Sequence, residues 1–338
     1  MKQSLILGTA LGLSLGAVGA ASAATLDDVK ARGTLKCGVN TGLAGFAAPD
    51  ASGQWHGFDV DLCYAISAAI FGDPTKVEFT PTTGETRFTA LSSGEIDVLV
   101  RNSTWTFTRD VDLKLDFVGV NYYDGQGFIV SKDLGVTSAN ELDGATVCIQ
   151  TGTTTELNLA DFFSANGLSY QPVPIQTEAE ARQQFLASAC DAYTTDASGL
   201  AAARATYPSP DDYVILPEII SKEPLGPVVR HGDNDWADIV RWTFYALVEA
   251  EELGVTQANI DEMKESENPE VRRLLGTEGN LGAMFGLPAE WSYNAIKANG
   301  NYGEIFAANI GEGTPSNLAR GLNAQWKDGG LMYSPPFR

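Results

Sequence analysis

Two side chains of opposite charge follow strand-like segments of this sequence. Arg109 ends a turn rich in serine and threonine after the apolar segment 96–100, and Asp196 comes directly after segment 191–195. A guanidinium can hold a carboxylate in a bidentate geometry, and a carboxylate accepts hydrogen bonds from an ammonium group. The pair therefore suits a small zwitterion. From the residues alone, a solvated Arg109 paired with Asp110, and a helix N-cap role for Asp196, explain the pattern equally well.

Further polar groups stand at corresponding strand ends. Gly152, Thr153 and Thr154 lead from a strand-like segment into a helical one, where backbone N–H groups and the Thr154 hydroxyl could bind a carboxylate. An ordinary strand-to-helix turn with a threonine cap gives the same pattern. Asn102, which follows Arg101 at the end of another strand, could add side-chain or carbonyl contacts.

The elements that must place these groups alternate between short apolar strands and amphipathic helices, which is typical of α/β folds. Open sheets of this class bind ligands in the crevice outside the carboxyl ends of their strands. The pattern predicts strands at 35–39, 77–80, 96–100, 145–150, 169–174 and 191–195. It predicts helices at 58–70, from Glu85 to Gly94, at 154–164, after a capping box formed by Thr177 and Glu180, and at 197–205.

These elements form two βαβαβ units in series. The extended segments 126–131 and 226–230 leave the first unit and return after the second, so we expect two lobes joined by a two-stranded hinge. A discontinuous first lobe would contain residues 24–128 and 229–338, and the second would contain 129–228.

The last third of the chain differs in composition. Segments 235–252 and 255–266 are strongly helical, whereas 301–338 is rich in glycine, asparagine and aromatic residues. We expect this tail to wrap over the first lobe.

Composition and charge exclude several function classes. The 22 basic and 43 acidic side chains give a formal net charge of −21, a field that repels phosphate backbones and anionic headgroups. We therefore expect no nucleic acid and no membrane surface as partners. With only two histidines in the sequence, histidine-based metal sites and proton relays are not favoured. The sequence also contains no P-loop, G-x-S-x-G elbow or catalytic Cys–His pair. Neither a cofactor nor a metal is expected.

The first residues have the composition of a secretory signal. Lys2 precedes an apolar run over 5–18, and Ala21, Ser22 and Ala23 form an A-x-A cleavage site. We expect cleavage after Ala23 and export to the periplasm. A single anchoring helix is the alternative, but the run is shorter than the ~20 residues needed to cross a bilayer.

Export affects how the cysteines are interpreted. Cys37, Cys63, Cys148 and Cys190 form no C-x-x-C pair, and an oxidising compartment favours two disulfides with three possible connectivities. We favour Cys37–Cys63 and Cys148–Cys190, because each pair then lies inside one expected lobe. Four buried free thiols are the alternative.

Several short motifs, in this order and spacing, resemble those of the periplasmic amino-acid-binding proteins, solute-binding protein family 3, that serve polar amino-acid ABC transporters. They are Gly38-Val39, Gly57-Phe58-Asp59-Val60-Asp61-Leu62, Gly94-Glu95-Ile96-Asp97, Thr104-x-Thr106-x-x-Arg109, Gln150-x-Gly152-Thr153-Thr154-x-Glu156 and Asp191-Ala192-Tyr193-x-x-Asp196. The resemblance extends over about residues 33–250. The cysteine positions and the tail, with Asn301-Tyr302-Gly303-Glu304-Ile305-Phe306 and Pro335-Pro336-Phe337-Arg338, resemble the general L-amino-acid and glutamate/glutamine/aspartate/asparagine-binding subgroup.

The resemblance implies a type II periplasmic binding protein fold and a role for each candidate residue. Arg109, assisted by Thr104 and the turn at Thr154, would bind the α-carboxylate of an amino acid, and Asp196 would accept from its ammonium. Arg87 lies 22 residues before Arg109 and matches the arginine that reaches the side-chain carboxylate in glutamate- and aspartate-binding relatives. An exposed Arg87 paired with a nearby acid is the alternative.

One position departs from the family pattern. Many relatives stack an aromatic ring over the ligand in the loop after the first strand, but Leu43 stands there, with Phe46 three residues later. Trp105 could cover the ligand instead, although plain packing explains it equally well. A looser apolar lid would allow broad specificity.

The resemblance implies a monomeric receptor, not an enzyme. It would bind glutamate, glutamine, aspartate, asparagine or a broader set of L-amino acids between its lobes and deliver the ligand to an ABC transporter permease. A periplasmic dehydratase-type enzyme on the same fold is the alternative, and it would need a general acid in the cleft. A sensor module is a third possibility, and it would need a separate signalling partner.

Overall fold

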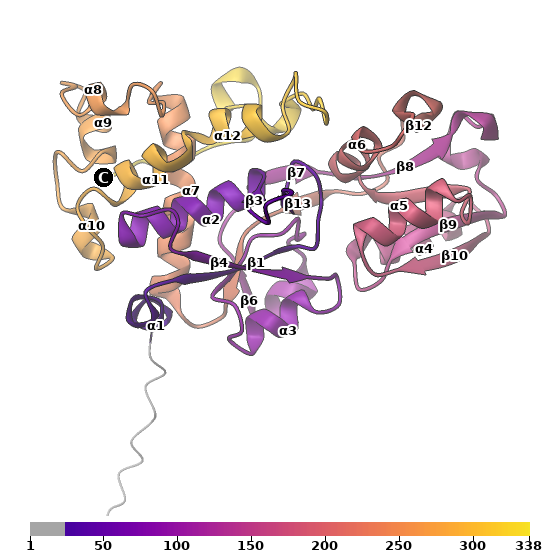
Figure 1. The fold of residues 1–338 in the computed structure, drawn as a ribbon, viewed down its shortest axis with the longest axis horizontal. Coiled ribbons are helices and arrows are strands. Elements are labelled where there is room, and N and C mark those ends of the chain that lie inside the picture. Colours follow the sequence, from indigo (N-terminus) through magenta and orange to yellow (C-terminus); the bar gives the residue numbers. More distant parts are fainter. Residues whose placement is uncertain (1–23) are drawn as a thin grey trace, which may run out of the picture.

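Two five-stranded sheets, one in each of two lobes, organise residues 24–338, which are the part of the chain that the computed structural model describes (Figure 1). The expected leader and its cleavage after Ala23 lie outside these residues. The lobes lie side by side along the longest axis, and the chain passes between them twice. This arrangement confirms the predicted α/β architecture with two sheet-containing lobes. Within the described residues, no helix has the length and apolar composition that crossing a membrane requires.

The sheet of lobe 1 has the strand order β4-β1-β5-β14-β6. Its strands are β1 (Leu35–Asn40), β4 (Val77–Thr82), β5 (Val98–Leu99), β6 (Leu115–Phe117) and β14 (Val228–Arg230), and a small hairpin joins β2 (Ala48–Pro49) to β3 (Trp55–His56). Its first helices are α1 (Thr25–Arg32), α2 (Phe58–Phe71) and α3 (Arg87–Ser92). Because β4 and β5 both pair in parallel with β1, α2 and α3 serve as crossover connections.

Helix α2 shows how the sequence produces this lobe. It is apolar on nearly all sides, apart from Asp59 and Asp61 near its start, because it lies between the sheet and the C-terminal helices and buries most of its surface. It ends at Gly72, whose φ of 68° is the left-handed conformation that terminates many helices.

Lobe 2 repeats the plan with the strand order β10-β9-β11-β8-β12. Its strands are β8 (Gln126–Ser131), β9 (Ala145–Gln150), β10 (Tyr170–Ile175), β11 (Ala192–Asp196) and β12 (Tyr213–Ile215). Its helices are α4 (Thr154–Ala165), α5 (Glu178–Leu186) and α6 (Ala197–Ala205). Strands β9, β10 and β11 are parallel, so the expected βαβαβ unit is present, and β8 and β12 extend it in antiparallel fashion.

The hinge lies a few residues before the segments that we expected to form it. Strand β7 (Tyr122–Asp124) pairs in antiparallel fashion with β13 (Glu223–Leu225), and Figure 1 shows this pair between the lobes. Segments 126–131 and 226–230 do not pair with each other, because β8 belongs to the sheet of lobe 2 and β14 to that of lobe 1. The reason is burial: most residues of β8 are fully buried, so this apolar segment belongs inside a sheet rather than in an exposed connection.

Helices of the C-terminal third cover one side of lobe 1, in orange and yellow in Figure 1. They are α7 (Asn234–Glu252), α8 (Ile260–Met263), α9 (Pro269–Leu274), α10 (Leu281–Met284), α11 (Trp291–Asn299) and α12 (Tyr302–Asn309). The tail packs on lobe 1 as expected, since the Tyr302 hydroxyl donates to the Asn121 carbonyl at 2.9 Å. The helix expected over 255–266 shrinks to α8, because Thr256 and Asn259 hydrogen-bond each other's backbone and form a turn.

Both favoured cysteine pairs are present as disulfides. Cys37–Cys63 joins β1 to α2, and Cys148–Cys190 joins β9 to the segment before β11, with Cα–Cα distances of 6.3 and 5.6 Å. Each crosslink therefore lies within one lobe and attaches an interior strand of its sheet to a neighbouring element.

Candidate functional site

The two lobes touch each other through the residues that the sequence indicated. Asn102 of lobe 1 donates to Asp196 of lobe 2 at 3.1 Å, and the hydroxyls of Thr104 and Thr154 lie 3.2 Å apart. The backbones also approach closely, because a Cβ atom added to Gly84 would lie 2.6 Å from the Thr151 carbonyl oxygen. The structure therefore represents a closed arrangement in which the strand ends of both lobes face one site.

Arg109 lies in a short π-helical turn (Thr108–Asp112) at the edge of lobe 1 and is 7% exposed. Its Nη1 donates to the Thr104 carbonyl at 2.8 Å, and its guanidinium lies over the Phe88 ring, 4.9 Å from the centroid. Burial lowers its pKa to about 10, so the side chain remains charged at neutral pH. Arg109 is thus a buried cation, and the alternative of a solvated arginine paired with Asp110 does not describe it.

Arg87 and Arg101 are two further buried guanidiniums beside Arg109. Arg87 begins α3 and donates to the Ser103 hydroxyl at 3.2 Å and, across the lobes, to the Gly152 carbonyl at 3.4 Å. Burial, then the charges of Arg101 and Arg109, lower the pKa of Arg87 well below its ordinary value. This direction indicates an electrostatic cost that a nearby anion would reduce. Arg87 is therefore not an exposed helix arginine.

Asp196 ends β11 at the N-cap position of α6 and is 4% exposed, yet its side chain makes no capping hydrogen bond. It accepts instead from Asn102, which in turn accepts from Asn40 at 3.1 Å. Burial, followed by the charges of Asp124 and Glu223, raises the pKa of Asp196 well above its ordinary value. A cation beside it would favour its charged form. The N-cap interpretation of Asp196 therefore fails, and its carboxylate is directed toward the other lobe.

The turn before α4 supplies two threonines with different partners. Thr153 is the N-cap of α4, since its hydroxyl accepts from the Glu156 N–H at 3.2 Å and donates to the Gln150 carbonyl at 2.6 Å. The Thr154 hydroxyl instead lies 3.2 Å from the Thr104 hydroxyl of lobe 1 and donates to Glu223 of the hinge strand β13 at 3.0 Å. Only Thr154 thus presents its side chain between the lobes.

Two of the three apolar lid candidates lie in the hydrophobic core rather than over the site. Leu43 and Phe46 are buried in the hydrophobic core of lobe 1, where Phe46 packs edge-on against Phe58 and Tyr122 at centroid distances of 6.0 and 5.7 Å. Trp105 is 40% exposed, is stacked 5.7 Å from Phe117 and donates to Asp110 at 2.6 Å. Packing in the core accounts for Leu43 and Phe46, whereas contact between Trp105 and the ligand stays a prediction.

Several buried acids of this region were not expected from the sequence. Glu223 on β13 is fully buried and accepts from groups of both lobes, and Asp124 on β7 accepts from Ser198. Burial raises the pKa of Asp124 to about 6. Glu178, which begins α5, accepts from the Tyr193 hydroxyl at 2.6 Å, and burial raises its pKa too. A single acid forms no motif in a chain with this many acidic residues. Only the positions of Glu223 and Asp124 beside the hinge, and of Glu178 at a helix start, could have indicated a role in the site.

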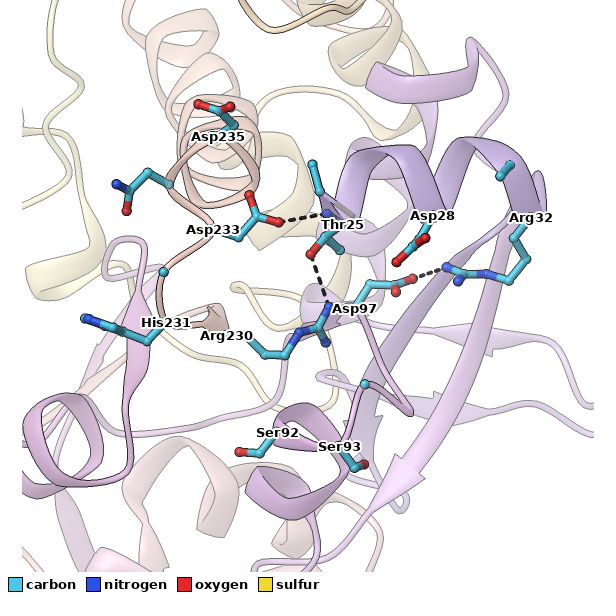
Figure 2. A pocket seen from close by; sticks show the side chains of 15 residues that line it. Thr25, Asp28, Arg32, Ser92, Ser93, Asp97, Arg230, His231, Asp233 and Asp235 are labelled. Carbon is cyan, nitrogen blue, oxygen red and sulfur yellow. Dashed lines mark hydrogen bonds and ion pairs between the residues drawn. The ribbon is translucent and has the colours of Figure 1, made fainter. Parts of the chain in front are cut away.

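A cavity of about 940 Å³ lies away from these residues, between α1, the loop after α3 and the segment before α7. Figure 2 shows that several of its charged side chains, among them both arginines, already have partners. Arg32 pairs with Asp97, Arg230 donates to the Thr25 hydroxyl at 3.1 Å, and Asp233 accepts from the Thr25 N–H at 2.7 Å. This cavity is therefore a paired polar surface of lobe 1, and the interlobe residues remain the candidate site.

Comparisons with known proteins agree with this geometry. Residues 35–259 match the family model of bacterial extracellular solute-binding proteins, family 3. The glutamate/glutamine/aspartate/asparagine-binding protein of Rhodobacter capsulatus is 67% identical, and the general L-amino acid-binding periplasmic protein of Rhizobium johnstonii is 60% identical, both over the full length of both chains. A Brucella ovis ABC transporter periplasmic binding protein, solved with glutathione bound, is 58% identical with a TM-score of 0.92, covering 94% of this chain and all of its own.

Proposed function

This chain belongs to the bacterial extracellular solute-binding proteins, family 3, and we propose that it binds a polar or acidic L-amino acid between its lobes for uptake by an ABC transporter permease. Glutamate, glutamine, aspartate and asparagine are the expected ligands, as the name of the Rhodobacter capsulatus relative suggests for that protein. Export to the periplasm, cleavage after Ala23 and a monomeric state are part of this proposal.

The observation that carries the proposal is a buried cation and a buried anion on opposite lobes. Arg109 comes from lobe 1 and Asp196 from lobe 2, and both are nearly inaccessible in the closed arrangement. Every free L-amino acid carries an α-carboxylate and an α-ammonium, so it can engage both groups only when the lobes are closed. Binding would therefore shift the population of conformations toward closure, and a permease could recognise the closed surface.

The surrounding groups give each end of the ligand a distinct environment. Arg109 and the Thr154 backbone N–H at the start of α4 would donate to the α-carboxylate, and Thr104 would lie beside it, whereas Asp196 and Asn102 would face the ammonium end. Among the described side chains, Arg87 Nε and Arg101 Nη2 are buried N–H groups without a hydrogen-bond partner. They could donate to the side-chain carboxylate or amide oxygen of the ligand, which explains why acidic and amide amino acids would both bind.

Glutathione is a second candidate ligand, because the Brucella ovis protein was solved with it bound. Its γ-glutamyl end carries a free ammonium and a free α-carboxylate, which are the groups that Arg109 and Asp196 would recognise. The remainder of the tripeptide would have to occupy space that a free amino acid leaves empty.

Isothermal titration calorimetry of the purified protein with the twenty amino acids and glutathione tests the proposal. We expect saturable binding of at least one acidic or amide amino acid and no binding of compounds that lack an α-ammonium. Failure of all twenty to bind would refute the proposal. Incubating the bound ligand with a high protein concentration tests the enzymatic alternative, which product formation would favour.

A further inference from the structure

The carboxylate of Glu223 has a complete set of hydrogen-bond donors. Glu223 lies on the hinge strand β13 and is 1% exposed. One of its oxygens accepts from the hydroxyls of Thr104 at 2.5 Å and Thr154 at 3.0 Å, and the other accepts from the Asn158 amide at 2.7 Å and the Ser221 hydroxyl at 2.6 Å. An ionised carboxylate is purely an acceptor with about four lone-pair sites, so this donor set suits the charged form.

The donors come from both lobes. Thr104 belongs to lobe 1, whereas Thr154 and Asn158 lie in the first two turns of α4 in lobe 2. Thr104 and Thr154 are also the residues that we propose to lie beside the ligand α-carboxylate, with their hydroxyl protons directed to Glu223. The charge of Glu223 therefore lies one side chain away from the proposed ligand and is excluded from solvent together with it.

Buried charges of both signs meet at this position. Three buried guanidiniums, those of Arg87, Arg101 and Arg109, come from lobe 1. Asp196 and Glu223 oppose the charges of Arg87 and Arg109, and Glu178, Asp196 and Asp59 oppose that of Arg101. Burial is the main influence on Arg109 and lowers its pKa, and the strongest neighbouring influence, which opposes that shift, is the charge of Glu223. Without Glu223, the arginines would present a more positive site to the ligand.

We propose that Glu223 is a specificity-determining residue, whose negative charge offsets the three arginines so that the site accepts neutral amide amino acids as well as acidic ones. The inference rests on the proposed function, because it concerns the same site. Glutamate and glutamine have nearly the same shape but differ by one unit of charge. Their relative affinity therefore reports the electrostatic potential where the ligand side chain lies.

The test is calorimetric titration of Glu223→Gln with glutamate and with glutamine. The substitution keeps the size of the side chain, and the neighbouring hydroxyls can rotate to accept from its amide. Removal of one charge at this range in a buried site should raise the affinity for glutamate relative to glutamine by a factor on the order of ten. A merely structural role would weaken both ligands equally and leave their ratio unchanged.

Two matched variants separate charge from packing. Glu223→Asp keeps the charge and should keep the ratio of the unchanged protein, even if both affinities fall. Glu218→Gln removes a carboxylate that accepts from Ser138 and Ala139 within lobe 2, and its ratio should not move. An unchanged ratio in Glu223→Gln, with glutamate still bound, would overturn this inference and leave the proposed function standing.

The unchanged protein provides an independent check if Glu223→Gln does not fold. Its affinities for glutamate and glutamine should lie within about tenfold of each other, because the balanced site distinguishes little between their charges. A preference for glutamate of a thousandfold or more would contradict the charge balance. Binding of neither ligand would instead refute the proposed function.

Discussion

Arg109→Met removes the guanidinium that we propose to hold the ligand α-carboxylate while keeping an unbranched side chain in its place. In the structure this guanidinium donates one hydrogen bond to the Thr104 carbonyl and packs on the Phe88 ring. Its other N–H groups are therefore available for a ligand. Every candidate amino acid has an α-carboxylate, so the substitution should weaken all of them.

The magnitude follows from burial. Removing one partner of a buried, hydrogen-bonded charge pair costs about 3–5 kcal/mol, because the remaining charge loses its compensation. At 1.4 kcal/mol per tenfold change in the dissociation constant, that is a loss of roughly 10²-fold to several thousandfold. The loss of cation–π packing on Phe88 falls on the protein itself and should appear as a small decrease in melting temperature.

The assay is calorimetric titration of the variant and the unchanged protein with the same amino acid. Arg182→Met is the matched control, since Arg182 lies on α5 in lobe 2 and, among residues 24–338, donates only to the Thr206 carbonyl at 2.9 Å. Its affinity should equal that of the unchanged protein. An Arg109→Met variant that folds normally and loses less than threefold in affinity would refute the role of Arg109.

Three further substitutions test other parts of the site and the fold. Asp196→Asn should weaken every amino acid by a similar factor, because all carry the same ammonium, and a calorimetric effect confined to one ligand would contradict that role. Arg87→Met should weaken glutamate and aspartate more than glutamine in the same assay, and equal losses would indicate a structural role. Asp59 has its pKa raised to about 6, mainly by burial. The stabilisation that protonated Asp59 gives the folded state is therefore present below pH 4 and is lost as the pH rises through 6. Urea unfolding should show the free energy of unfolding of Asp59→Asn rising by about 3 kcal/mol relative to that of the unchanged protein between pH 4 and pH 7. A difference that stays constant with pH would contradict this.

The fold was accessible to sequence reasoning because buried strands and amphipathic helices leave periodic patterns. The hinge was not, since β7 and β13 have three residues each and carry no periodicity of their own. The hinge was predicted at the apolar segment 126–131 instead, although its burial places this segment inside a sheet. Similarly, helical composition over 255–266 did not reveal that Thr256 and Asn259 would hydrogen-bond the backbone in a turn.

The charged anchors could be found because their types, order and spacing form motifs. Arg109 and Asp196 come together from opposite lobes as the sequence suggested, and their roles in binding remain predictions. Spacing could not reveal whether Phe46 faces the site or the core, because both places accept an aromatic ring, and the structure buries it in the core. Glu223 had no motif at all, and only the three-dimensional convergence of its donors distinguishes it from the other acids.

The placement of the two disulfides has a mechanical consequence. Cys37–Cys63 braces one lobe and Cys148–Cys190 the other, and within the described chain neither crosslink spans β7 and β13. Oxidation of the cysteines should therefore stiffen each lobe without restricting rotation of the lobes about the hinge. Reduction would destabilise each lobe separately. The rates of lobe opening and closing should therefore depend far less on redox conditions than the stability of each lobe against unfolding does.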